Sequence, residues 1–171
     1  MADASIDYFR RLFEYERNSN MKSLASLETV PAERRTDPAF RRALDLHAHV
    51  AASRLMWLYR FGAEPVQPET YNPPNLSFAE VRALVEHMEQ GWAEFLERLS
   101  EDEMDEDLEY ESMANGRFRS TKSEIFTHLA GHTWYHRGQI ATLVRAAGGV
   151  PAMTDFMVWS RQPVTASAPR K

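Results

Sequence analysis

Histidines at helical spacing are the residues of this sequence that could do chemistry. His128, His132 and His136 recur every four residues in segment 123–147, which also carries a stripe of aliphatic residues. With about 100° per residue around a helix axis and Ile125 set at zero, His132 falls near about −20° and His136 near about +20°. Both imidazoles are therefore expected in the middle of the apolar stripe, where leucine or isoleucine is usual.

Two imidazole rings in a buried stripe cost free energy unless each finds a partner. A divalent metal ion satisfies both His132 and His136, because residues four apart lie on one face and their rings can converge on one ion. His128 and His136 are two turns apart, about 12 Å along the axis, so all three cannot easily share one ion. The alternative is that these histidines are core residues with ordinary hydrogen bonds. A metal site here needs at least one further ligand from another helix.

The segment 38–61 offers two candidates for that further ligand, His47 and His49. Each lies at the edge of a different apolar face, and periodicity does not choose between them. His87 has acidic and amide neighbours and is expected on the surface. The chain has no cysteine, so the ligands must be nitrogen or oxygen atoms. Three imidazoles with open positions suit zinc, nickel or ferrous iron, and open positions imply catalysis.

Four amphipathic segments, separated by proline or glycine residues, are expected to form the helices that position these histidines. They cover residues 5–28, 38–61, 77–99 and 121–147. Four long helices with one possible hairpin predict an all-α four-helix bundle, in which sites form between facing helices.

The connections add smaller features to this bundle. Asn115-Gly116 stands between two short alternating runs and predicts a short hairpin before the fourth helix. The proline-rich loop 63–75 is long enough to be functional and could cover the site. We expect a single domain over residues 1–162, with one more short helical turn near its end, and a disordered tail over residues 163–171.

Bulk properties exclude several classes of partner. The net charge is −5 and no lysine or arginine cluster dominates, which argues against nucleic acid binding. The absence of cysteine excludes disulfides, thiolate metal sites and a cysteine nucleophile. No apolar run approaches the roughly 20 residues of a membrane helix, and the N-terminus lacks the apolar core of a signal peptide. The sequence therefore predicts a cytoplasmic protein without a membrane partner.

A longer motif surrounds the histidine pair. The run His132-Thr-Trp-Tyr-His136-Arg-Gly-Gln139-Ile resembles the hallmark of the DinB family of DinB/YfiT-like metalloenzymes, His-x-x-x-His-Arg-Gly-Gln followed by an aliphatic residue. His49, eight residues before Trp57, is similar to the family's pattern in the second helix. The ending Gly-Val-Pro, followed by Asp155-Phe, also resembles the family, so the resemblance covers nearly the whole chain.

The resemblance implies a four-helix bundle of DinB/YfiT type and unusual connectivity, with a metal ion held by His49, His132 and His136. It thereby favours His49 over His47. Homodimers are common among such proteins, so it also implies a homodimer. Related members are S-transferases or isomerases that use low-molecular-weight thiols, which implies a small-molecule substrate and a thiol of that kind.

Other residues near the histidines receive separate predictions. His128 is expected to contact the substrate or a ligand histidine, and Gln139, which returns to the stripe near about −40°, to orient a ligand or bind substrate. Arg137 is expected to form a salt bridge with a neighbouring helix, and Gly138 to let another helix approach closely.

Two functions remain open. The spacing of acidic and basic residues does not identify a catalytic acid or base, so the local motifs do not choose between reactions. The first is a metal-dependent enzyme, a thiol S-transferase or a hydrolase, in which an open position on zinc or nickel, or on iron, lowers the pKa of a bound thiol or water. The second is a non-catalytic, stress-related protein that binds a metal or another ligand. A plain helical dimer, whose histidines are only hydrogen-bonded, is the remaining alternative.

Overall fold

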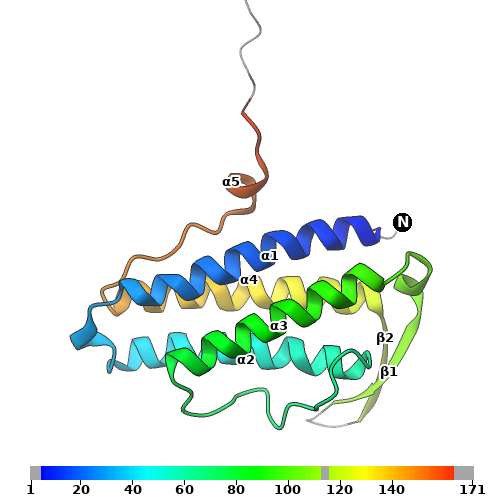
Figure 1. The fold of residues 1–171 in the computed structure, drawn as a ribbon, viewed down its shortest axis with the longest axis horizontal. Helices are drawn as coiled ribbons and strands as arrows, with labels where there is room; N and C mark the ends of the chain where they lie inside the picture. The colour runs from blue at the N-terminus through cyan, green and yellow to red at the C-terminus, as the bar shows by residue number, and fades with distance from the viewer. Residues whose placement is uncertain (1–4, 113–115, 164–171) are drawn as a thin grey trace, which may run out of the picture.

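Four long helices lie side by side in the computed structural model, which describes residues 5–112 and 116–163 (Figure 1). They are α1 (Ile6–Ser26), α2 (Pro38–Arg60), α3 (Phe78–Arg98) and α4 (Lys122–Ala146). The predicted all-α bundle is therefore confirmed. The helices α2 and α3 run in the same direction, because the loop between them returns along the bundle before α3 begins (Figure 1). This parallel arrangement agrees with the unusual connectivity that the family resemblance implied.

Capping side chains fix where the helices begin. The Ser5 side chain accepts a hydrogen bond from the backbone N–H of Tyr8 and starts α1. Ser77 and Glu80 form a capping box at α3. Thr121 and Glu124 form a second capping box, which starts α4 at Lys122. Polar side chains thus satisfy backbone N–H groups that have no partner within each helix.

The predicted hairpin is present before α4. Its strands are β1 (Asp107–Glu111) and β2 (Arg117–Thr121), which pair antiparallel with Tyr110 opposite Phe118. Gly116 has a φ of 85°, a left-handed conformation that suits glycine at a turn. Asn115 of the predicted turn lies outside the described residues.

Shorter elements complete the chain. Three 3-10 turns lie at Leu27–Thr29, Ala32–Arg34 and Asp102–Asp105. The short helix α5 (Phe156–Ser160) confirms the helical turn predicted near the end of the chain. Its Phe156 and Trp159 rings pack against Tyr15 of α1. The predicted disordered tail lies outside the described residues from residue 164 onward.

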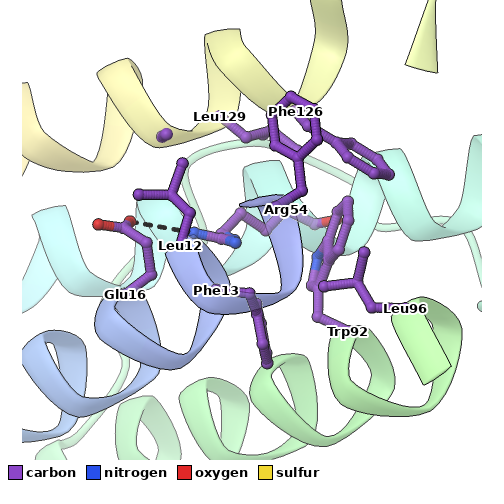
Figure 2. Close-up of a pocket in the computed structure, with 10 residues that line it drawn as sticks. Leu12, Phe13, Glu16, Arg54, Trp92, Leu96, Phe126 and Leu129 are labelled. Atoms are coloured by element: carbon purple, nitrogen blue, oxygen red, sulfur yellow. Dashed lines mark hydrogen bonds and ion pairs between the residues drawn. The ribbon is translucent and has the colours of Figure 1, made fainter. Parts of the chain in front are cut away.

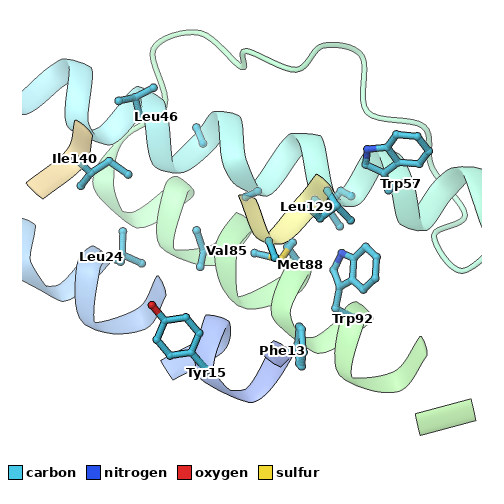
Figure 3. Packing of buried hydrophobic residues seen from close by; sticks show 14 of the residues in the cluster. Phe13, Tyr15, Leu24, Leu46, Trp57, Val85, Met88, Trp92, Leu129 and Ile140 are labelled. Atoms are coloured by element: carbon cyan, nitrogen blue, oxygen red, sulfur yellow. The ribbon is translucent and has the colours of Figure 1, made fainter. Parts of the chain in front are cut away.

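The core lies between the four helices (Figure 3). Trp92 of α3, Leu24 of α1 and Leu129 of α4 are each 2% exposed or less and point inward from different helices. The prediction that Gly138 allows a close helix approach is wrong, because a Cβ there would meet nothing within 4 Å. Gly91 of α3 has that role instead, since a Cβ there would lie 2.9 Å from Leu58 of α2. Among the described residues, no helix is long and apolar enough to cross a membrane.

A buried ionic network ties α1 to α2 and α4. The Glu16 carboxylate, 2% exposed, lies 3.3 Å from Arg54 of α2 and 3.1 Å from Arg137 of α4. Figure 2 shows Arg54 reaching Glu16 across a small cavity lined with aromatic and aliphatic side chains. The predicted salt bridge of Arg137 is thereby confirmed. Since Arg137 directly follows His136, the network helps to fix the rotation of α4 about its axis.

Candidate metal centre

Three imidazoles from two helices converge on one point between α2 and α4. The Nε2 atom of His132 lies 3.2 Å from Nε2 of His49 and 3.1 Å from Nε2 of His136. One nitrogen from each ring lies within 4.8 Å of the other two, and all three residues are half-buried. Among the described residues, this is the one group of three or more histidine or acidic side chains that could hold a metal ion.

The rotation of α2 decides which of its histidines reaches this point. His49 faces α4, whereas His47 lies about 200° away around the axis and points into the bundle. His47 is 5% exposed, and its Nε2 lies 3.4 Å from the Ser23 hydroxyl of α1. Burial lowers the pKa of His47 to about 4, so it is a neutral core residue. The structure therefore places His49, and not His47, beside the α4 pair.

Hydrogen bonds at the Nδ1 atoms orient two of the three rings. Nδ1 of His49 lies 2.9 Å from the Tyr71 carbonyl oxygen, which can only accept a hydrogen bond. Nδ1 of His136 lies 2.9 Å from the Gln139 side-chain oxygen and donates to it in the same way. In the neutral rings the Nε2 atoms of His49 and His136 therefore carry lone pairs, both directed at His132.

The protons available in this cluster do not account for its short contacts. A neutral His132 has one ring proton, so its Nε2 can donate to one neighbouring Nε2 at most, although both lie within 3.2 Å. Its Nδ1 atom is buried and has no hydrogen-bond partner among the described residues. Three nitrogen lone pairs that meet without enough protons form a donor set suited to a cation.

The spacing of the nitrogens fits a tetrahedral ion. Zinc binds imidazole nitrogen at about 2.0–2.1 Å, which at the tetrahedral angle separates two nitrogens by about 3.3 Å. The separations of 3.1 and 3.2 Å observed at His132 are close to that value. The residues present therefore fit a divalent ion of this kind, with His49, His132 and His136 as its protein ligands.

Burial keeps two of the rings in the neutral state that metal binding requires. Desolvation, reinforced by the neighbouring rings of His136 and His49, lowers the pKa of His132 to about 4. Desolvation also lowers the pKa of His49 below its usual value, although the hydrogen bond to Tyr71 opposes that shift. At neutral pH these rings present lone pairs, so binding of a cation releases few protons.

A pocket of about 290 Å³ opens beside the histidines. His49, Ser53 and Trp57 of α2 form one wall, and His128, Leu129 and His132 of α4 form another. His128 is exposed, and its ring stacks on His132 with 5.6 Å between centroids. His128 is thus placed to contact a molecule in the pocket, and Gln139 is placed to hold His136.

Other pocket residues were not found from the sequence. Tyr71 comes from the proline-rich loop, which lies against the site through its carbonyl contact with His49. Tyr110 of β1 and Arg60 of α2 complete the far end of the pocket. A shared face of α2 was the signal that could have indicated these pocket residues from the sequence. Helical spacing places on that face His49, Ser53, Trp57 and Arg60.

Fold and site together define a class of protein. This is an all-α bundle in which two facing helices present three convergent imidazoles next to an open pocket.

The chain belongs to the DinB family, whose sequence model matches residues 1–165. It is similar to Protein DinB of Bacillus subtilis (strain 168), with 25% identity over 158 residues, covering 88% of this chain and 92% of that protein. No solved structure matches the chain.

Proposed function

We propose that the chain binds one divalent metal ion through Nε2 of His49, His132 and His136 and is a metal-dependent enzyme acting on a small molecule. The observation that carries this proposal is the meeting of three Nε2 atoms, with separations of 3.1 and 3.2 Å at His132, and too few protons to join them by hydrogen bonds. Membership of the DinB family supports it, because the three histidines that meet are the ones that the resemblance implied as ligands.

The number of protein ligands favours catalysis over a purely structural role. Within the described part of the chain, no carboxylate joins the three histidines in the cluster. Structural zinc sites are usually closed by four protein ligands, whereas catalytic sites keep a position for water or substrate. The adjoining pocket of about 290 Å³ gives a small molecule access to that position.

Each residue of the site has a distinct task in this proposal. The three histidines hold the ion, which when bound supplies a Lewis acid that lowers the pKa of a coordinated thiol or water. The Tyr71 carbonyl and the Gln139 side chain keep two rings oriented. His128 contacts the substrate from the exposed side of the cluster.

Metal analysis tests the first part of the proposal. Purified protein is loaded with zinc or nickel, dialysed, and analysed for metal by mass spectrometry. We expect about one ion per chain in the parent and none in His132→Ala. The matched control is His87→Ala, because His87 is exposed, hydrogen-bonds to Glu64 among the described residues, and is not part of the histidine cluster. Equal metal content in the parent and His132→Ala would refute the site. Zinc and nickel are the proposed ions, with ferrous iron as the third candidate.

The reaction is tested separately. We propose thiol S-transfer, with a low-molecular-weight thiol as co-substrate, or hydrolysis, and a homodimer as the assembly. Metal-loaded protein is supplied with a panel of thiols and chlorodinitrobenzene-like electrophiles, and with ester substrates. Turnover that depends on both metal and thiol supports the transferase, and turnover without thiol supports the hydrolase. One bound ion without any turnover would favour a non-catalytic, stress-related protein that binds a metal or ligand.

A further inference from the structure

A second chemical group faces the same pocket from its far end. His49, Ser53, Trp57 and Arg60 are spaced by four, four and three residues along α2 and therefore share one helix face. All four line the pocket beside the histidine cluster. Arg60 lies about 16 Å from His49 along the helix axis, at about 1.5 Å per residue. The pocket thus has imidazoles at one end and a guanidinium group at the other.

Contacts from three elements hold the Arg60 guanidinium in place. Its central carbon lies 4.5 Å from the centre of the Trp57 ring and 5.0 Å from that of the Tyr110 ring. Its Nη2 atom donates hydrogen bonds to the Tyr71 hydroxyl at 3.0 Å and to the Glu111 carbonyl at 2.7 Å. A guanidinium fixed in this way loses little further side-chain entropy when it binds a ligand.

Arg60 forms no ion pair with the described part of the chain. No carboxylate there lies within the 4.0 Å of an ion pair, and Glu109 of the adjacent strand pairs with Arg117 and Arg119 instead. Among the described residues, the Arg60 Nε and Nη1 atoms also donate no hydrogen bond. The buried Arg54 differs, because it is paired with Glu16.

The lining of the pocket points to an anionic ligand. The described residues that line it include one arginine and no aspartate or glutamate. A fixed cation without an ion-pair partner at the end of a concave site favours a negatively charged group of the ligand, and an ion bound at the histidines would add positive charge. Donors on Nε and Nη1 suit the oxygens of a carboxylate or a phosphate monoester.

We propose that Arg60 is the anion-binding end of the substrate pocket. The ligand is then an elongated small molecule with a carboxylate or phosphate at Arg60 and its reacting group at the three histidines. The position of the reacting group rests on the function proposed above, whereas the anion site rests on the contacts of Arg60. A small compact anion could not span the two ends of the pocket, so chain length should decide the affinity.

A series of thiols measures this span. Zinc-loaded protein is titrated by calorimetry with ω-mercaptoalkanoates of three to eleven carbons and with ω-mercaptoalkanols of the same lengths. We expect acid and alcohol to bind alike when short, and the acid to bind roughly tenfold tighter once the carboxylate reaches Arg60. Arg60→Gln should abolish that preference and leave the affinity for the alcohol unchanged. Arg98→Gln, an exposed arginine on α3 that does not line the pocket, is the matched control.

A second arm separates failure of the anion site from failure of the proposed function. Metal-free protein is titrated with 6-phenylhexanoate, 6-phenylhexyl phosphate and 6-phenylhexanol, none of which carries a thiol. Tighter binding of either anion than of the alcohol, lost in Arg60→Gln, supports the anion site even if no thiol binds to the zinc-loaded protein. If Arg60→Gln does not fold, Arg60→Lys, which keeps the charge, should keep part of the preference.

Equal binding of anion and alcohol by the parent in both arms would overturn the proposal, and that comparison requires no variant. Arg60 would then only fasten β1 and the proline-rich loop to α2. A preference that persists in Arg60→Gln would overturn it as well, because another residue would hold the anion. Loss of thiol binding alone would count against the proposed function only.

Discussion

Replacing Glu16 by glutamine is expected to lower the free energy of unfolding by about 3 kcal/mol, because it removes the anion shared by two buried arginines. Arg54 and Arg137 are 4% and 5% exposed, and both form ion pairs with Glu16. Breaking a buried pair by removing one partner costs about 3–5 kcal/mol. We take the lower value because Arg54 keeps its bond to Thr133 and Arg137 keeps its bonds to neighbouring polar groups.

Urea and thermal unfolding followed by circular dichroism measure this effect. For a chain of this size, about 3 kcal/mol corresponds to a decrease of about 6–12 °C in the melting temperature. The matched control is Glu28→Gln, which removes an ion pair between Glu28 and Arg82 whose side chains are 54% and 38% exposed. That variant should lose less than about 1 kcal/mol. If the two variants lose the same small amount, the buried network does not stabilise the bundle as we argue.

Three further predictions concern single side chains. Burial raises the pKa of Glu89 above 4.5, so the folded state binds more protons than the unfolded state as the pH rises from 4.5, and stability falls through that window. Glu89→Gln should remove this loss, which denaturant titrations at pH 4.5 and 7 measure. If the free energy of unfolding of the variant falls between these two pH values by as much as that of the parent, the assignment is wrong. Gln139→Leu should weaken zinc binding by about tenfold or more, because it removes the hydrogen bond that orients His136, whereas Gln90→Leu on α3 should not change the zinc affinity in competition with a chelator. Gly138→Ala should stabilise the protein by about 1 kcal/mol, since a Cβ there meets nothing within 4 Å and alanine favours the helix; a lower melting temperature would refute this.

Local signals in the sequence determined the helices and the relation between two of the three histidines in the candidate site. Ser77 with Glu80 predicts the capping box that starts α3, because those groups interact within one turn. His132 and His136 lie on one face of α4 for the same reason, since their spacing of four residues matches one helical turn. Interactions of this kind depend only on neighbours along the chain, so the sequence pattern is sufficient to predict them.

Contacts between distant segments decided the rest. Periodicity allowed either His47 or His49, and only the resemblance to a family favoured His49; in the structure, the rotation of α2 against α4 turns His47 toward α1 and His49 toward the site. The prediction placed a close helix approach at Gly138, but the close approach lies at Gly91, where α3 meets α2. No local pattern shows which face of a helix meets a neighbouring helix. Arg60 gains its place through Tyr71 and Tyr110, which come from a loop and a strand. Spacing along a chain fixes the face on which a side chain lies, whereas the packing of several helices decides what that face meets.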